Sequence, residues 1–214
     1  MFHTPQLLTF IADDGGVEDV ALQTPGSWPS IRHDGQRFLL MGDGLCTNIY
    51  DRDGGVVLSG IACNQAWMAS YGPERTIVFS RAVGSNASEL VTMLDDGTNE
   101  EVVVPAAPST LNQEASFSFD GTLIVFVRTG PTSVELDTVD RASHEVRTMF
   151  GSPNYFIHAP HFTPDGTAVI FEGGPDAVDL RRLDIAKATV DVLIPGLQPA
   201  NKQPLNLGIA VAPE

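Results

Sequence analysis

An eleven-residue pattern recurs along the chain and limits the folds that it can adopt. Its clearest copies are HFTPDGTAVIF at residues 161–171 and SFSFDGTLIVF at residues 116–126. Looser copies are SIRHDGQRFLL from Ser30 and WMASYGPERTIVF from Trp67. Each copy reads as a short strand, a turn that contains Gly and a second, more apolar strand, because Gly accepts the positive φ that a tight turn requires. The chain is therefore predicted to consist of repeated β-hairpins.

The repeat has a regular period. An Asp ends the predicted third strand of each unit, and it recurs at spacings of 44, 45 and 44 residues as Asp51, Asp95, Asp140 and Asp184. A period of about 40–45 residues with four short strands per repeat is typical of a propeller blade. A flat β-sandwich can hold as many strands but does not need a fixed period. The predicted fold is all-β, a single β-propeller domain that spans residues 1–214.

Four full units and one composite unit predict five blades. The full units are expected at residues 27–61, 62–108, 109–154 and 155–202. An open ring would leave a bare sheet edge, so the two ends of the chain are expected to close it together. The C-terminal LGIAVAPE resembles a first strand, and residues 7–24 read as a third and a fourth strand. Residues 203–214 with residues 1–26 are therefore predicted to form the closing blade, of three or four strands.

Composition and charge exclude several classes of protein. Hydrophobic residues make up 43% of the chain and charged residues 18%, which excludes a disordered chain. The formal net charge is −15, and only 12 residues are Lys or Arg. Nucleic acids and anionic membrane surfaces both bind through basic side chains, so neither is expected as a partner. No run of 18 apolar residues occurs, so no membrane-spanning segment is predicted.

The two cysteines, Cys46 and Cys63, do not form a disulfide framework of the kind seen in small secreted domains. We expect two free thiols, which fits a reducing compartment and predicts a cytoplasmic protein. The N-terminal MFHTPQLLTFIADDGG has no basic region before an apolar stretch, so no signal peptide is predicted. The alternative is a mature periplasmic or secreted chain from which the signal has been removed.

No set of catalytic or metal-binding residues is visible. His158 and His161 are three residues apart, so in a regular strand they would point to opposite faces and could not share one ion. Glu114 is the one acid at the start of a predicted first strand, although a glycosidase needs a pair of carboxyl groups. A G-x-S-x-G nucleophile motif is absent. No catalytic residue, metal or cofactor is therefore predicted.

Polar residues precede the predicted first strands. The positions are Gly26-Ser27, Asn64-Gln65, Asn112-Gln113, Ile157-His158 and Asn206-Leu207. In a propeller this point lies beside the central channel, so Asn, Gln and His there can form a ring of hydrogen-bond donors and acceptors. The predicted ligand contacts are Asn64, Gln65, Asn112, Gln113, His158 and Asn206. Alternatively, these side chains hold neighbouring blades together, and the ligand binds the opposite rim around Asp53, Asp96 and Arg141.

The pattern x-F-[ST]-P-D-G-x-x-[IV]-x-F resembles the WD-repeat-like propeller repeat of the TolB-like family. The same repeat occurs in prolyl-oligopeptidase-type peptidases, the tricorn protease and oligogalacturonate lyases. The resemblance extends roughly from residue 27 to residue 196; Phe119 replaces the Pro in one copy, and Tyr71-Gly72-Pro73 lacks the Asp-Gly order. It implies a propeller fold but not one chemistry, because these families share blades and differ in function. Oligogalacturonate lyases have a His/Gln metal site, to which Gln65, Gln113 and His158 correspond only loosely.

Two functions remain open at this stage. The first is a non-enzymatic binding propeller that uses the channel mouth to bind a protein, a peptide or a neutral glycan. The second is a small enzyme, a lyase or hydrolase, that acts on a carbohydrate or small molecule at the central channel. A flat apolar patch on a rim would favour the first function, and a deep pocket with an acid of raised pKa would favour the second.

Overall fold

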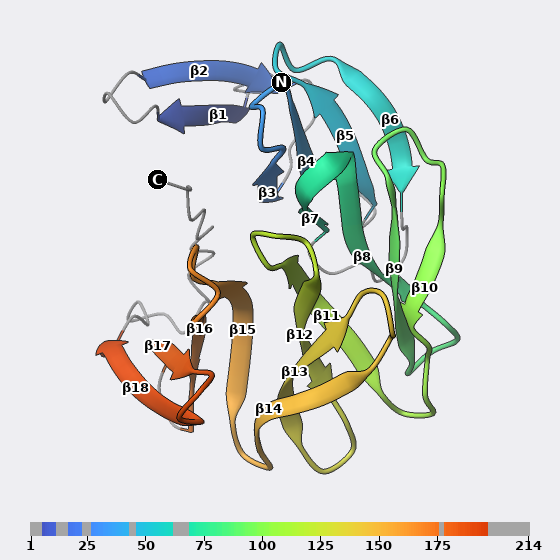
Figure 1. Cartoon of the computed structure of the whole chain (residues 1–214). Helices are drawn as coiled ribbons and strands as arrows, with labels where there is room; N and C mark the ends of the chain where they lie inside the picture. Colours follow the sequence, from blue (N-terminus) through green and yellow to red (C-terminus); the bar gives the residue numbers. More distant parts are fainter. Residues whose placement is uncertain are drawn as a thin grey trace, which may run out of the picture.

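The chain folds as an all-β propeller, which confirms the predicted fold class. The computed structural model describes residues 6–11, 17–22, 27–42, 46–61, 69–175 and 178–196. Within these ranges the strands form four sheets of four strands and one sheet of two strands. The four-stranded sheets, here called blades 1 to 4, follow one another around a common centre in chain order (Figure 1). In the part of the chain that is described, no helix is long and apolar enough to cross a membrane.

Blades 1 and 2 come from the first half of the chain. The strands of blade 1 are β3 (Ser27–Ile31), β4 (Arg37–Met41), β5 (Thr47–Asp51) and β6 (Val56–Ile61). The strands of blade 2 are β7 (Ser70–Tyr71), β8 (Thr76–Ala82), β9 (Ser88–Leu94) and β10 (Glu101–Val104). A short 3₁₀ turn, η1 (Pro73–Arg75), joins β7 to β8. Here Glu74 and Arg75 take positive φ values, so this turn differs from the Asp-Gly turns of the other blades.

Blades 3 and 4 match the two clearest copies of the repeat. The strands of blade 3 are β11 (Leu111–Phe117), β12 (Leu123–Thr129), β13 (Val134–Asp140) and β14 (Val146–Ser152). The strands of blade 4 are β15 (Phe156–Phe162), β16 (Ala168–Gly174), β17 (Asp179–Asp184) and β18 (Thr189–Ile194). In every blade neighbouring strands are antiparallel, the first strand lies toward the centre and the fourth lies outside (Figure 1).

The prediction of five complete blades is not met by the described residues, which form four. The N-terminal hairpin is present, because β1 (Gln6–Ile11) pairs with β2 (Val17–Leu22) in an antiparallel register that places Leu8 opposite Val20. It makes a sheet of only two strands. Residues 203–214, which were predicted to supply the first strand of this blade, lie outside the described residues.

The cores of the propeller lie between successive blades. Leu39 and Ile49 of blade 1 pack against Ile77, Phe79 and other apolar residues of blade 2. Similar clusters join blade 2 to blade 3 and blade 3 to blade 4. This arrangement follows from the sequence, because the second and third strands are apolar on both faces and each face meets a neighbouring blade.

The hairpin β1–β2 lies on the other face of blade 1. Val20 of β2 is buried with Phe38, Leu40 and Tyr50 of blade 1. The rings of Phe38 and Tyr50 are stacked, with centroids 5.2 Å apart. The two-stranded sheet therefore occupies the position that a preceding blade would take, on the side of blade 1 that faces away from blade 2.

The first strands carry a β-bulge that the sequence pattern did not predict. The register shifts between Ser27 and Ser30 in β3, between Gln113 and Ser116 in β11, and between His158 and His161 in β15. Each bulge contains one non-glycine residue with a left-handed backbone: Trp28 (φ 62°), Glu114 (φ 53°) and Ala159 (φ 47°). An extra residue on one strand bends the strand and changes the direction of its side chains. The bulges lie where the ligand contacts were predicted.

The expectation of two free thiols is wrong, because Cys46 is disulfide-bonded and no cysteine is free in the described residues. The other cysteine, Cys63, lies outside those residues. Nothing in the spacing of the cysteines indicated the bond, since two cysteines 17 positions apart are compatible with either state.

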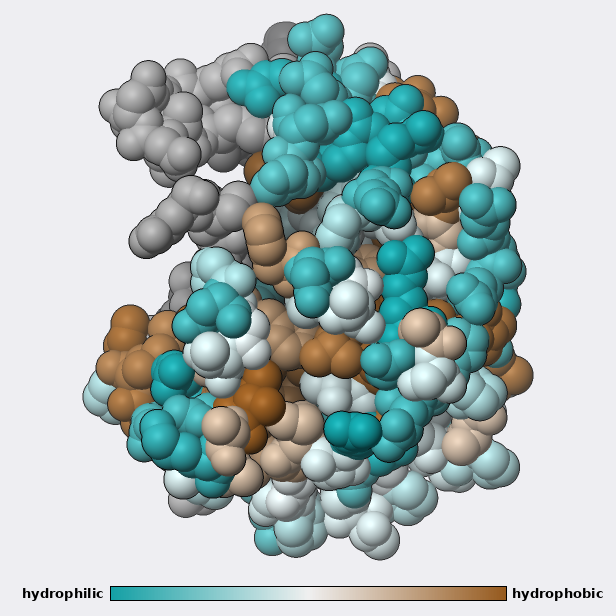
Figure 2. Space-filling model, in the orientation of Figure 1, coloured by the Kyte–Doolittle hydropathy of each residue, from teal (hydrophilic) through white to brown (hydrophobic). Residues whose placement is uncertain are grey.

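The outer strand of blade 4 exposes an apolar stretch. Val192, Leu193 and Ile194 at the end of β18 are 47%, 46% and 49% exposed. In the space-filling view the hydrophobic colour gathers over β18, whereas much of the same face is hydrophilic (Figure 2). Because β18 is the last strand of its sheet, its outer edge has no paired strand in the described chain.

Candidate functional site

The predicted ring of polar residues is described at three of its six positions. Asn112 and Gln113 lie on β11, and His158 lies on β15. Asn64, Gln65 and Asn206 lie outside the described residues. The three do not form one continuous surface, because Asn112 faces blade 2, whereas Gln113 faces away from it and His158 lies at the contact between blades 3 and 4.

Asn112 holds blade 3 to blade 2. Its side chain is buried, and its Nδ2 donates to the main-chain oxygen of Ser88 at 2.7 Å. Its own main-chain N–H donates to the Ser88 hydroxyl at 2.7 Å, and its main-chain oxygen accepts from the hydroxyls of Ser80 and Ser88. Three of its polar groups are thus used between blades, as in the alternative reading of the ring. Its Oδ1 has no hydrogen-bond partner.

Gln113 faces away from Asn112. Neighbouring residues of a strand point to opposite faces of a sheet. Asn112 bonds with blade 2, whereas Gln113 lies opposite Val127, whose side chain belongs to the apolar cluster between blades 3 and 4. The Gln113 side chain is half-buried and makes no hydrogen bond with any described residue. Its amide therefore still offers one acceptor and two donor hydrogens.

Glu114 and His158 form a polar contact between blades 3 and 4. Glu114 is buried, and its Oε1 lies 2.5 Å from Nδ1 of His158. Its Oε2 accepts a hydrogen bond of 2.6 Å from the main-chain N–H of Ala159. The left-handed conformation of Glu114 at the bulge allows its carboxylate to reach the bulge of the next blade. Two strained residues, Glu114 and Ala159, are thus joined directly.

The His158 ring is held on more than one side. The ring centroid of Phe156 lies 4.0 Å from that of His158. On β16 the residue directly opposite His158 is Glu172, which is buried. An imidazole in contact with a carboxyl group can exchange protons or bind a donor-bearing ligand. Since the His158 side chain remains 28% exposed, a ligand can reach it.

The two histidines of blade 4 do not alternate as the sequence suggested. His158 pairs with Glu172 and His161 pairs with Ile170, which are two residues apart on β16. Because of the bulge, the two rings lie on the same side of the sheet, although they are three residues apart. Burial lowers the pKa of His161 to about 4, so this ring is neutral at pH 7. The described residues contain no group of three or more His, Cys, Asp or Glu that could hold a metal ion.

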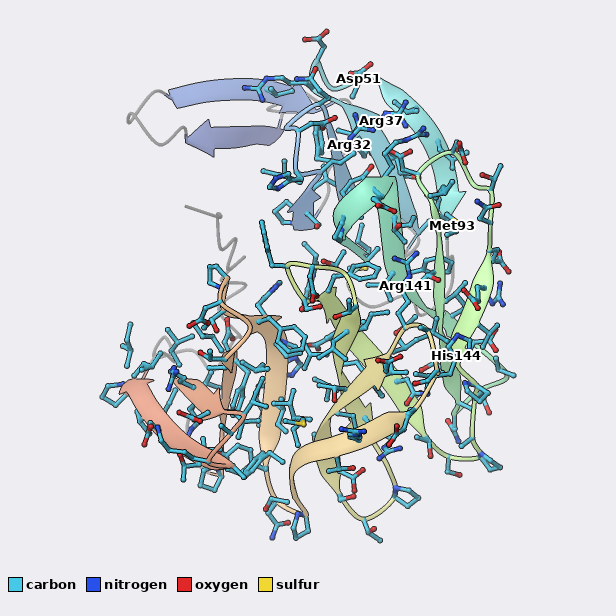
Figure 3. All side chains as sticks on the ribbon, viewed as in Figure 1. Arg32, Arg37, Asp51, Met93, Arg141 and His144 are labelled. Carbon is cyan, nitrogen blue, oxygen red and sulfur yellow. The ribbon has the colours of Figure 1, made fainter. Side chains whose placement is uncertain are left out.

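The opposite rim is rich in charge and carries an exposed aromatic contact. Phe119 is 53% exposed, and its ring lies 5.9 Å from that of His33, so turns of blades 1 and 3 meet there. Arg141 lies over the ring of Phe117, and Figure 3 shows it near the strands of blade 2. The Nη2 of Arg141 is 3.5 Å from the Thr76 hydroxyl. Among the described residues near this rim the exposed large apolar side chains are those of Phe119, Ile31, Val56 and Val57, and charged side chains lie beside them.

A cluster of three arginines around Asp95 joins blades 1 and 2 at that rim. Asp95 is fully buried, and its carboxylate accepts 2.7 Å and 2.8 Å hydrogen bonds from Arg32 and Arg75. Arg37 lies 3.1 Å from the same carboxylate. Figure 3 shows Arg32 and Arg37 close together at the inner end of blade 1. Hydrogen bonds to Asp34 and Asp95 raise the pKa of Arg32, so it stays charged.

Two site residues escaped the sequence reasoning. Glu114 was noted only as a lone acid. In the repeat His158 corresponds to Gln113, 45 residues earlier, so Glu114 stands one residue beyond the equivalent position, and no spacing in the sequence indicated that the two bulges would bring Glu114 and His158 together. Glu172 stands alone as a charge within the apolar run VIFEGG of β16, and an acid inside a buried strand needs a polar neighbour.

Comparison with known proteins gives the fold and leaves the chemistry open. The chain matches no protein-family model, and no curated protein matches it by sequence. Among solved structures it is similar to a protein assigned as TolB from Agrobacterium tumefaciens, with a TM-score of 0.70 and 14% identity over 86% of this chain. A TolB from Acinetobacter baumannii gives a TM-score of 0.69 with 17% identity over 88% of this chain.

An enzyme is similar as well. An oligogalacturonate lyase in complex with manganese gives a TM-score of 0.60 with 16% identity over 88% of this chain. The chain spans 68% of the Agrobacterium protein, 49% of the Acinetobacter protein and 61% of the lyase. At these identities the likeness concerns the fold alone. The chain therefore has a β-propeller fold that resembles the TolB-like propellers.

Proposed function

We propose that this chain is a non-enzymatic binding propeller whose site lies on the first strands of blades 3 and 4, β11 and β15. The observation that carries the proposal is the half-buried His158, which is fixed by Glu114. Gln113, the residue before Glu114 on β11, makes no hydrogen bond with described residues. The site presents acceptors and donors that are already oriented by the bulges. Of a protein, a peptide or a neutral glycan, an extended peptide suits it best, because each peptide group offers one donor and one acceptor.

Replacing Gln113 with Ala is expected to weaken peptide binding by about fivefold, since one hydrogen bond contributes about 1 kcal/mol net. The melting temperature should stay the same, because the side chain has no partner among the described residues. Binding is measured by calorimetry with a peptide selected from a random library on the wild-type protein. The control is Gln36→Ala, on the exposed turn of the opposite rim.

Adding His158→Ala should extend the loss of affinity to about tenfold or more. This second change also lowers the melting temperature, because it leaves the buried Glu114 without its imidazole partner. If Gln113→Ala lowers the melting temperature and leaves binding intact, Gln113 supports the fold and the proposed site is wrong. If the peptide library yields no ligand and a glycan array does, the proposed ligand is a neutral glycan in place of the peptide.

The second candidate is an enzyme, a lyase or hydrolase, that acts on a carbohydrate or small molecule at the same place. It is favoured by one observation, the contact of His158 with Glu114 on a strand position opposite Glu172. Such a set can supply a general acid and a general base. Turnover of an oligosaccharide library by the wild type, abolished in Glu114→Gln, would establish this function in place of the first.

A closing fifth blade also remains part of the proposal. Its support is the packing of Val20 against Phe38, Leu40 and Tyr50, which places β1–β2 as the neighbour of blade 1. Deletion of residues 203–214 is expected to lower the melting temperature of the whole domain, because the hairpin would lose its inner strand. Deletion of residues 1–4 is the control. An unchanged melting temperature after the first deletion would contradict closure by both ends.

We also propose a compartment from the state of the cysteines. The disulfide at Cys46 supports an oxidising compartment, which was the alternative to a cytoplasmic protein. A titration of free thiols in the denatured protein, made without reductant, is expected to find none. Recovery of two thiols per chain from freshly lysed cells would support the cytoplasm instead.

A further inference from the structure

A cavity lies between blades 2 and 3. It is formed by the connection from β10 to β11, residues 104–110, and by the loop from β12 to β13, residues 130–133. Asn112, Arg128 and Glu135 also line it. Its volume is about 300 Å³, at the lower end of the range for ligand sites of roughly 300–1,000 Å³. We call it the lateral pocket.

One buried polar atom of the lateral pocket has no partner. Asn112 is only 1% exposed, and its Nδ2, main-chain N–H and main-chain oxygen all bond with blade 2. Its Oδ1 is buried and accepts no hydrogen bond. Buried carbonyl oxygens in folded proteins nearly always have a donor, because an unmet acceptor costs free energy. A ligand group that carries an N–H or an O–H would satisfy this oxygen.

The charges beside the pocket favour a positive group. Arg128 donates to Glu135 at 2.9 Å and lies 2.6 Å from the carboxylate of Asp137. Asp137 is fully buried. One guanidinium thus serves two carboxylates, which leaves an excess of one negative charge. An anionic ligand would meet repulsion here, whereas a cation would supply the missing charge.

The remaining wall carries the hydroxyls of Thr110, Thr132 and Ser133 and three residues that suit a short hydrocarbon chain. Val104, Pro105 and Pro131 line the pocket and carry no side-chain donor or acceptor. The pocket thus combines apolar walls with an acceptor and a carboxylate. A primary ammonium group has three donor hydrogens and one positive charge, which match both.

We propose that the lateral pocket binds a small organic cation through its primary ammonium group. The ammonium donates to Asn112 Oδ1 and to the carboxylate of Glu135, and its alkyl chain lies against Val104, Pro105 and Pro131. The group belongs either to a free amine or to the lysine side chain of a peptide. This site is separate from the one at Gln113 and His158, so either can fail without the other.

The test uses the whole chain and three probes with the same three-carbon chain: propylamine hydrochloride, 1-propanol and sodium propionate, at constant ionic strength. Saturation-transfer NMR detects binding, and a shift in the melting temperature gives its strength. Propylamine is expected to bind and to raise the melting temperature, while propionate does neither and propanol binds at least tenfold more weakly. Nα-acetyl-lysine N-methylamide is tested beside propylamine, to separate a peptide source from a free amine; binding of either supports the site.

Two variants place the binding in the pocket. Ala107→Trp, on the exposed connection, fills the pocket and should abolish the propylamine signal, while Ala142→Trp, on the exposed turn after β13, should retain it. Thr132→Trp blocks the pocket from the opposite loop if Ala107→Trp does not fold. Gln113→Ala should leave propylamine binding unchanged. Equal binding of propylamine and propanol, or full binding in both Trp variants of the pocket, would overturn the proposal.

Discussion

Replacing Asp95 with Asn is expected to lower the free energy of unfolding by about 3–5 kcal/mol, the cost of removing one partner from a buried ion pair. Asp95 is fully buried and receives Arg32 and Arg37 from blade 1 as well as Arg75 from its own blade. The amide would leave three guanidinium groups close together without a counter-charge. For a domain of this size the melting temperature should fall by on the order of 10 °C.

The neighbouring Asp96 supplies the matched control. It is exposed, and it bonds with Thr98 of its own turn and with Arg75. Asp96→Asn should leave the melting temperature almost unchanged, because exposed ion pairs contribute little. Thermal unfolding followed by circular dichroism measures both variants. Equal melting temperatures for the two variants would mean that the arginine cluster does not hold blades 1 and 2 together.

Replacing Asp137 with Asn is expected to raise the free energy of unfolding at neutral pH, whereas replacing Asp95 lowers it. Burial raises the pKa of this carboxyl from near 3.8 to about 6, against the influence of Arg128. The folded protein therefore binds a proton more tightly than the unfolded chain, and stability from this group is lost as pH rises through 6. Two units of pKa correspond to about 3 kcal/mol. Between pH 4 and pH 7 the wild type should lose about this much relative to Asp137→Asn.

The measurement is urea unfolding of both proteins at several pH values. Above pH 7 Asp137→Asn should be the more stable protein, and near pH 4 the two should be alike. Glu135→Gln is the control, since Glu135 bonds the same guanidinium from a partly exposed position. If the free energies of unfolding of the wild type and of Asp137→Asn change in parallel from pH 4 to pH 7, Asp137 ionises in the folded protein as easily as in water.

The repeat pattern predicted the blades well because it reports local structure. An apolar strand, a turn with Gly and a second strand can be recognised within eleven residues, and blades 1, 3 and 4 begin where the pattern places them. At Gly121 the turn takes the expected positive φ of 72°, with Asp120 accepting from the N–H of Thr122. Blade 2 departs from the pattern in sequence, and it departs in structure at the same turn.

Contacts between blades could not be predicted in the same way. The four Asp residues at the period looked equivalent, and Asp51, Asp140 and Asp184 do accept hydrogen bonds from the N–H groups of their own turns. Asp95 instead bonds arginines, two of which are about 60 residues earlier in the chain. Such a partner depends on how two blades meet, and a pattern within one blade holds no information about it.

The ring of polar residues was similarly predicted from position alone. Asn112 and Gln113 were placed on one surface because they are adjacent, yet adjacent strand residues face opposite sides. His158 and His161 were separated by the same rule, although the bulge returns them to one side. The strain at Glu114 and Ala159 has no signature in single residues, since neither is a glycine.

The bulge in β11 also determines how this strand can change in length. A regular strand would point Asn112 and Ser116 to the same face, but Asn112 bonds blade 2 and Ser116 bonds Pro160 of blade 4. Deleting the one extra residue between them would leave both side chains facing the same blades, because residues three apart in a regular strand point to opposite faces. Deleting a residue of β11 outside the bulge would instead turn one part of the strand over. The bulge is therefore the place in β11 where a one-residue deletion keeps these two contacts between blades, and what such a deletion removes is the left-handed conformation of Glu114.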